Sequence, residues 1–131
     1  MAAPAHVFLE EVIDADGQVA IDQLAKVLRV SQTVLAFASG LSRDAISTPL
    51  RLKAGATQTK LHDMVEIINR ILPWTRSAAQ AFVWYHTHPL PSFGGRTPED
   101  LVKEGRAETV KAYFDRSADG GDAGNGSRSA V

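Results

Sequence analysis

The stretch Leu61-His62-Asp63-Met64-Val65-Glu66-Ile67-Ile68-Asn69-Arg70-Ile71-Leu72 decides the fold of this 131-residue chain. Its large apolar residues recur at intervals of three and four positions, at Leu61, Met64, Val65, Ile68, Ile71 and Leu72. This spacing predicts an α-helix with one wide apolar stripe. Pro73 follows directly and predicts the end of that helix.

Shorter helices are predicted on the N-terminal side of this stretch. In chain order we expect a helix over residues 23–28 capped by Asp22, a helix over 32–39 capped by Ser31 and followed by Gly40, a short helix begun by Ser42 and limited by Pro49, and a polar loop over 51–59. The caps are assigned because short polar side chains accept hydrogen bonds from the first free N–H groups of a helix.

Helices are predicted on the C-terminal side as well. We expect a helix over residues 78–85 with Ser77 and Gln80 as a capping box, a helix from Thr97-Pro98 to Glu104 that Gly105 ends, a last helix with Val110, Tyr113 and Phe114 on its apolar face, and disorder over 120–131. Residues 81–85 have high β-propensity, but the capping box and the alanine-rich turn before them favour helix. The sequence therefore predicts an all-α fold.

Composition narrows the class of protein. The chain has no cysteine, which excludes disulfides, thiolate metal sites and a cysteine nucleophile. Its first residues lack the features of a signal peptide, and no apolar run approaches membrane-spanning length. We expect a cytoplasmic protein without membrane contact, built as one domain or as two small subdomains sharing a core.

A basic segment coincides with a possible DNA-reading motif. Residues 17–60 carry six bases against two acids, although the whole chain has a net charge of −1. Residues 35–46 fit a helix-turn-helix, with Ala36 for close packing, Gly40 in the turn, and Leu41 and Ile46 as core anchors. The expected DNA-binding residues are Ser42, Arg43, Asp44, Ser47, Arg51 and Lys53.

Two other interpretations of this region stay open. An overlapping register over residues 24–35 fits less well, because Arg29 stands where a glycine is expected. An ordinary helical hairpin with the same caps would leave the basic residues as a solvated face.

His86-Thr87-His88-Pro89 resembles the zinc motif of JAMM-type peptidases, in which a Ser and an Asp follow at fixed spacing. Here Thr97 and Asp100 have the right mutual spacing, but they come one residue too late and Thr replaces Ser. The sheet that such a site needs is also not predicted. We therefore favour the two histidines as residues at a helix C-terminus, where cations are stabilised, and expect no metal, cofactor or catalytic residue.

The whole pattern resembles the Xre/MbcA/ParS type II antitoxins, over roughly residues 20–121. The most specific match lies after the long helix. It comprises Trp84, Pro89-Leu90-Pro91, the turn Phe93-Gly94-Gly95-Arg96-Thr97-Pro98, a short helix to Glu104, Gly105, and a last helix from Val110 to Gly120-Gly121. The His-Thr-His segment departs from the family's pattern.

The resemblance implies a non-enzymatic antitoxin of a type II toxin–antitoxin system. Its partner would be a RES-domain toxin that consumes NAD or transfers ADP-ribose, whose active site the C-terminal region blocks. The implied organisation is an N-terminal helix-turn-helix-like dimerisation region over residues 1–56, a toxin-binding domain over 57–121, and a disordered tail over 122–131. The N-terminal helices would form a homodimer and extend the function to transcription regulation, by binding the operon's own operator DNA.

The expected toxin-binding residues are Trp84, Phe93, Gly94, Gly95, Arg96, Arg106, Lys111, Tyr113, Arg116 and Gly120. The two glycines permit close backbone approach or positive φ, and Phe93 and Trp84 are expected to pack the turn against the long helix. Arg106, Lys111 and Arg116 would mask a pocket that binds the phosphates of NAD. We expect residues 113–121 to block the toxin's NAD site. The alternatives are a stand-alone helix-turn-helix regulator and, behind it, a JAMM-like zinc hydrolase.

Overall fold

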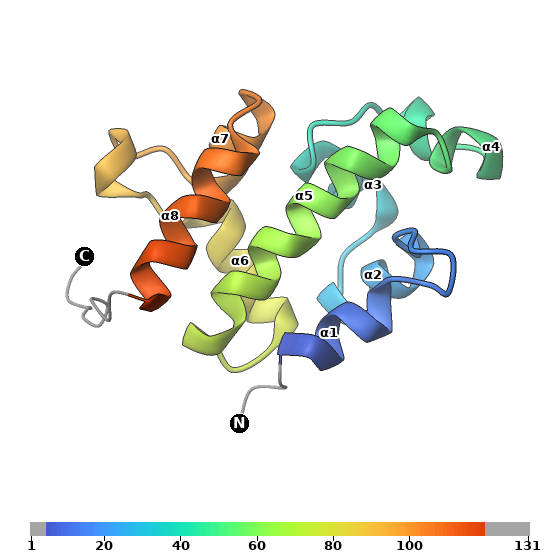
Figure 1. Ribbon diagram of the computed structural model, residues 1–131. Helices are drawn as coiled ribbons and strands as arrows, with labels where there is room; N and C mark the ends of the chain where they lie inside the picture. Colours follow the sequence, from blue (N-terminus) through green and yellow to red (C-terminus); the bar gives the residue numbers. More distant parts are fainter. Residues whose placement is uncertain (1–4, 120–131) are drawn as a thin grey trace.

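The computed structural model describes residues 5–119, and this part of the chain is all-α, as predicted (Figure 1). The elements are α1 (Ala5–Val12), α2 (Ile21–Leu28), α3 (Gln32–Ala38), the 3-10 helix η1 (Arg43–Ile46), α4 (Pro49–Leu52), α5 (Gly55–Ile71), η2 (Leu72–Trp74), α6 (Ala78–Thr87), η3 (Pro91–Phe93), α7 (Pro98–Lys103) and α8 (Ala107–Asp119). The expected tail over 122–131 lies outside the described residues. None of the described helices is long and apolar enough to cross a membrane.

Helix α5 runs through the middle of the molecule and contacts α1, α4, α6, α7 and α8 (Figure 1). Its predicted apolar stripe is buried, with the large side chains from Leu61 to Ile71 essentially inaccessible to water. The helix begins at Gly55, six residues earlier than the stripe, so the predicted polar loop is wrong.

Tertiary hydrogen bonds explain why the polar segment is helical. The side-chain oxygen of Gln58 accepts from the backbone N–H of Val19 at 2.8 Å, and its amide nitrogen donates to the carbonyl of Leu52 at 3.0 Å. Gln58 is therefore a buried structural residue that ties the start of α5 to the segment before α2.

One hydrophobic core extends from Phe8 of α1 to Phe114 of α8. The regions expected on either side of residue 56 therefore share this core. Helix α1, which was not predicted from the sequence, contributes Phe8 and Val12 to it. Tyr85 of α6 is fully buried and donates its hydroxyl hydrogen to the carbonyl of Ala38 at 2.7 Å, which joins α6 to the end of α3.

The helix-turn-helix forms in the overlapping register. Helices α2 and α3 are separated by three residues, and Arg29 takes the left-handed conformation with φ of 61°. Arg29 thus occupies the position where a glycine is expected, and the N–H of Val30 closes the turn on the carbonyl of Ala25 at 3.1 Å. Ser31 caps α3 as predicted, by accepting from the N–H of Val34.

The favoured register does not form a second helix of useful length. Residues after Gly40 form η1 and α4, each of four residues, instead of a continuous helix that could lie along a major groove. Ser42 stands at the N-cap of η1 but makes no side-chain capping bond. Asp22 is not the cap of α2 either, because the helix begins at Ile21 and the Asp22 carboxylate accepts from the Gln32 side chain.

The C-terminal predictions hold in most details. Ser77 caps α6 by accepting from the N–H of Gln80 at 3.2 Å, although the Gln80 side chain returns to the N–H of Arg76 instead of Ser77. Residues 81–85 are helical. Thr97 and Asp100 form a complete capping box at the start of α7.

Candidate partner-binding surface

The connector, residues 88–97, turns the chain back between α6 and α7. The N–H of Leu90 donates to the carbonyl of Arg96 at 2.9 Å and closes the turn. Gly94 and Gly95 have φ of 69° and 84°, a region that a side chain would strain. Leu90 is buried, so the connector is anchored on the core and holds Phe93 in a fixed place.

An aromatic cluster follows the connector onto α8. It consists of Trp74, Trp84, Phe93, Tyr113 and Phe114. The Trp84 and Phe114 rings are 5.8 Å apart, and Phe93 meets Tyr113 edge-on at 5.4 Å. The connector therefore packs against α8, where the sequence predicted packing against the long helix.

The aromatic cluster is buried at one end and exposed at the other. Phe114 is 2% exposed and belongs to the core, whereas Trp74 is 50% exposed. Trp84, Phe93 and Tyr113 are half-buried. Such a patch of rings on a fixed backbone has the composition that dominates binding energy at protein interfaces.

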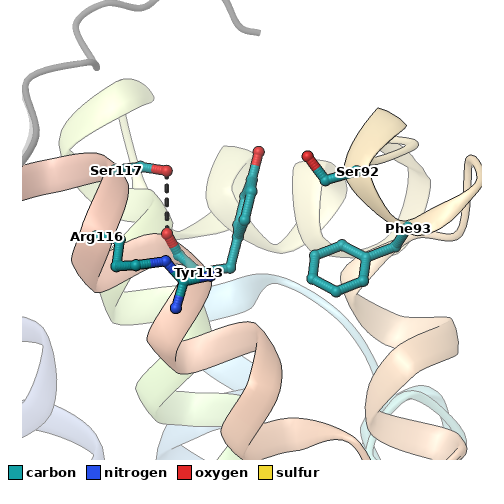
Figure 2. A pocket seen from close by; sticks show the side chains of 5 residues that line it. All are labelled: Ser92, Phe93, Tyr113, Arg116 and Ser117. Atoms are coloured by element: carbon teal, nitrogen blue, oxygen red, sulfur yellow. Dashed lines mark hydrogen bonds between the residues drawn. The ribbon is translucent and has the colours of Figure 1, made fainter.

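A shallow hollow of about 480 Å³ lies beside the aromatic cluster (Figure 2). It is lined by Ser92, Phe93, Tyr113, Arg116 and Ser117. Figure 2 shows the Tyr113 and Phe93 rings next to each other, one from α8 and one from the connector. Ser117 donates its hydroxyl hydrogen to the carbonyl of Tyr113 at 3.0 Å, so this hydroxyl is fixed on α8.

Arg116 lines the hollow, Arg106 lies by the Phe93 ring, and Arg96 belongs to the connector; these three arginines differ in their partners. Arg96 pairs with Glu104 at 2.6 Å. Arg106 lies 5.4 Å from the Phe93 ring centre and 4.0 Å from the same glutamate. Arg116 has no ion pair with any side chain described in the structure.

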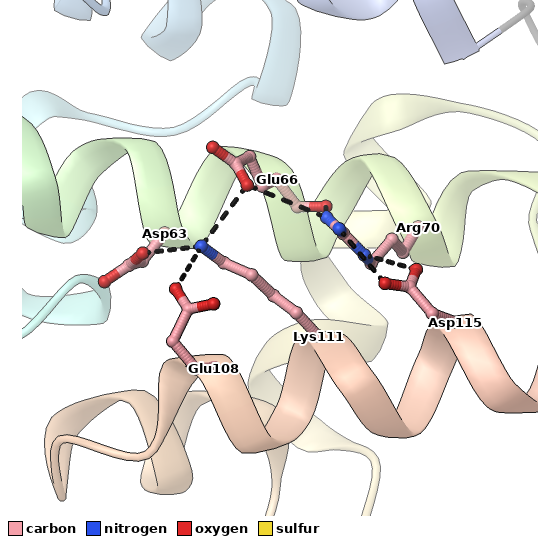
Figure 3. Close-up of polar contacts among 6 residues, drawn as sticks. All are labelled: Asp63, Glu66, Arg70, Glu108, Lys111 and Asp115. Carbon is pink, nitrogen blue, oxygen red and sulfur yellow. Dashed lines mark hydrogen bonds and ion pairs between the residues drawn. The ribbon is translucent and has the colours of Figure 1, made fainter.

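Lys111 does not belong to this surface, although the sequence placed it there. It is 8% exposed and its ammonium nitrogen meets Asp63 at 2.8 Å, Glu108 at 2.8 Å and Glu66 at 3.2 Å (Figure 3). Burial disfavours its charge, but hydrogen bonds to Asp63 and Glu108 outweigh burial and raise the pKa of Lys111. This lysine fastens α8 to α5.

A second ion pair continues the same seam between α5 and α8. Arg70 contacts Asp115 at 2.8 Å, and Figure 3 shows the two pairs side by side along the helices. Asp115, the neighbour of Arg116 in the sequence, is thus paired with Arg70.

The histidines of the connector region have structural partners. His88 stacks on Trp84 with ring centres 4.0 Å apart, and burial lowers the pKa of His88 below its ordinary 6.5. His86 pairs with the buried Glu99, which also accepts from Lys103 at 2.8 Å. Among the side chains that the structure describes, no three His, Asp or Glu residues come close enough to hold a metal ion.

The residues that imitate a zinc motif serve a different purpose. Thr97 accepts from the N–H of Asp100 at 3.1 Å, and Asp100 accepts from the N–H of Thr97 at 3.2 Å. Both side chains are therefore used to begin α7.

The expected DNA-binding residues all lie in and around η1 and α4, and all are exposed: Ser42, Arg43, Asp44, Ser47, Arg51 and Lys53. The Ser47 hydroxyl turns back to the carbonyl of Asp44 at 2.8 Å. Because η1 and α4 hold four residues each, no continuous helix carries all six of these side chains, as a recognition helix would.

The structure thus gathers most of the expected toxin-binding residues at one end of the molecule. Trp84, Phe93, Gly94, Gly95, Arg96, Arg106, Tyr113 and Arg116 lie on or beside the connector and α8. Lys111 is set apart, and Gly120 lies outside the described residues. Trp74, Ser92 and Ser117 were not predicted from the sequence as members of this surface. For Ser117 the sequence offers a signal, because residues four apart are neighbours on a helix and Ser117 follows Tyr113 by four positions.

No family model, curated protein or solved structure matches this chain.

Proposed function

We propose that the chain is a cytoplasmic antitoxin, a non-enzymatic inhibitor that binds a RES-domain toxin and blocks its NAD-consuming or ADP-ribosylating active site. The observation that carries the proposal is the exposed aromatic and arginine surface built by the connector and α8. The resemblance in sequence is most specific over the same segment. A rigid turn that presents rings and guanidinium groups suits a role in binding a protein partner.

The test uses the purified full chain and a purified RES-domain toxin encoded beside it. The antitoxin is expected to stop NAD loss at equimolar concentration. Tyr113→Ala and Trp74→Ala are expected to raise the concentration needed for half protection by about tenfold or more, because exposed aromatic residues dominate such interfaces. Leu50→Ala is the matched control, since Leu50 is 83% exposed on α4, away from this surface. Full protection by both aromatic variants would contradict the proposal.

The proposed block by residues 113–121 needs a truncation that leaves the core intact. Deleting residues 113–131 would remove Phe114 from the core and Asp115 from its pair with Arg70, so lost protection would be ambiguous. Ending the chain after Asp119 avoids this. Loss of NAD protection with an unchanged melting temperature would assign the block to residues 120–131, and full protection would assign it to the described surface.

A second function, binding of operator DNA by a homodimer, is supported by the helix-turn-helix of α2 and α3. The exposed basic residues nearest to that turn are Lys26 and Arg29. Val34 and Phe37 of α3 are 41% and 64% exposed, which supports a further contact there. Fluorescence anisotropy with duplex DNA from upstream of the gene tests this role, and affinity should fall steeply with salt.

Two variants distinguish the two candidate DNA surfaces. If α2 and α3 bind DNA, Arg29→Ala weakens binding and Arg51→Ala does not; the reverse result would favour η1 and α4. Binding that does not change between low and high salt would exclude both.

A further inference from the structure

The hollow beside α8 is lined by two kinds of group, aromatic rings and a guanidinium, and each kind can bind one side chain of a partner. Phe93 and Tyr113 form an apolar edge with ring centres 5.4 Å apart, and Arg116 stands on the same helix three residues after Tyr113. Residues three apart are neighbours on a helix surface. A ligand at this place therefore meets aromatic carbon and a guanidinium group together (Figure 2).

The charge that remains around the hollow is positive. The described acids nearby are engaged, Asp115 by Arg70 and Glu104 by Arg96. Arg106 is shared between Glu104 and the Phe93 ring, and Arg116 keeps no described acidic partner. Arg116 is the charged residue among the five that line the hollow, and Arg106 adds a second arginine at the Phe93 ring, so the described charge at the hollow is positive. Charge complementarity thus calls for an anionic occupant.

The apolar lining determines which anion fits. Ser92 and Ser117 offer hydroxyl groups, but the two rings form much of the remaining wall. A nucleic acid strand would need ring planes that bases can stack on and a row of cations along its backbone. Here the two rings meet edge-on at 74° and the surplus charge is small. A carboxylate with an apolar neighbour uses both features, because guanidinium and carboxylate form strong paired hydrogen bonds.

We propose that this hollow is the docking site for an acidic segment of the partner protein, in which a carboxylate pairs with Arg116 and an adjacent aliphatic or aromatic side chain lies on Phe93 and Tyr113. This inference rests on the proposed function for the identity of the partner. The chemistry of the segment follows from the hollow alone.

The experiment records proton–nitrogen NMR spectra of the full-length ¹⁵N-labelled chain during titration with the peptide acetyl-Asp-Glu-Leu-Glu-Asp-amide. A single charged contact and one apolar side chain predict a dissociation constant on the order of 1 mM. The shifted amide signals should be those of Ser92, Phe93, Tyr113, Arg116 and Ser117. The neutral peptide acetyl-Asn-Gln-Leu-Gln-Asn-amide should bind about fivefold or more weakly, because it cannot form the ion pair.

Arg116→Glu is expected to weaken binding of the acidic peptide by about tenfold or more, since it replaces attraction by repulsion. Lys60→Glu is the control: it makes the same charge change at an exposed position of α5 and should leave the affinity unchanged. The spectra themselves show whether each variant is folded.

Several results would overturn the inference. They are the absence of shifts at saturating peptide, shifts outside the hollow, and an Arg116→Glu variant that binds as tightly as the parent chain. Tighter binding of the oligonucleotide octadeoxythymidylate would assign the surface to nucleic acid. Concentration-dependent shifts of the same signals without peptide would assign it to a second copy of the chain. NAD protection that fails while the peptide binds would remove the proposed function and leave this inference standing.

Discussion

Replacing Lys111 by Met tests whether this lysine fastens α8 to α5. Met keeps most of the length of the side chain and removes its charge, which leaves the carboxylates of Asp63 and Glu108 without a cation and Glu66 with Arg70 alone, 3.9 Å away. Removing one partner of a buried ion pair costs about 3–5 kcal/mol, whereas an exposed pair contributes about 0–1 kcal/mol.

The exposure of the three acids places Lys111→Met between these limits. The Asp63 side chain is 20% exposed, that of Glu66 is 39%, and that of Glu108 is 85%. Only Asp63 approaches the buried case, so we expect the free energy of unfolding to fall by about 2–3 kcal/mol. For a domain of this size the melting temperature should fall by roughly 6–12 °C.

Urea denaturation followed by circular dichroism measures this change. Arg116→Met is the matched control, because Arg116 lies on the same helix, is exposed and has no described ion pair; its effect should stay within about 0.5 kcal/mol. Adding Asp63→Leu to Lys111→Met should recover much of the loss, since the most buried unpaired charge is then gone. A Lys111→Met variant as stable as the parent chain would refute the reasoning and return Lys111 to the exposed surface.

Three further predictions concern single side chains. Arg29→Gly should raise the free energy of unfolding, measured in urea, by about 0.5–1 kcal/mol. It removes left-handed backbone strain of about 1–2 kcal/mol, and the extra freedom of glycine in the unfolded chain costs about 0.5–1 kcal/mol. Arg29→Ala keeps Cβ and should not stabilise the fold; equal effects of the two variants would show that the charge is responsible. Tyr85→Phe leaves the Ala38 carbonyl unpaired in the core, so a loss of about 1–2 kcal/mol is expected, and no loss would mean that this bond is not formed. The pKa of His88 is lower in the folded state than its ordinary 6.5. Below pH 6.5 the unfolded state therefore binds more protons than the folded state, so His88 makes the fold less stable as the pH falls through 6.5. Thermal denaturation at about pH 7.5 and about pH 5.5 should therefore show a smaller decrease for His88→Gln than for the parent chain, and an equal decrease would assign the pH dependence to other groups.

Local patterns predicted the helices whose signals are contained in a few neighbouring residues. The stripe from Leu61 to Leu72, the Ser31 cap, and the Thr97 cap with Pro98 after it are all in the structure. In the two caps one helical turn holds both the side chain and the backbone group that it serves, and the stripe is a regular repeat within one helix. Residues 81–85 are helical for the same reason, in spite of their β-propensity.

Predictions failed where distant contacts decide the outcome. The segment before Leu61 looked like a polar loop, but Gln58 finds partners at Val19 and Leu52, and only the first of these is far away in sequence. Arg29 takes a glycine's conformation because the packing of α2 and α3 fixes the turn between them. A sequence pattern reflects the local conformational preference of a residue, but it does not contain the tertiary contacts that hold the residue in another conformation.

The cations of α8 show the same limit within the candidate site. Lys111 and Arg116 are five residues apart, which turns them by about 140° around the helix axis. Lys111 thereby faces the carboxylates of α5, while Arg116 falls beside Tyr113 at the hollow. Composition alone treats the two residues as equivalent. Once Phe114 is known to face the core, the face of α8 left for a partner is the one that carries Tyr113 and Arg116, and substitution of the exposed Arg116 reports on binding with little effect on stability.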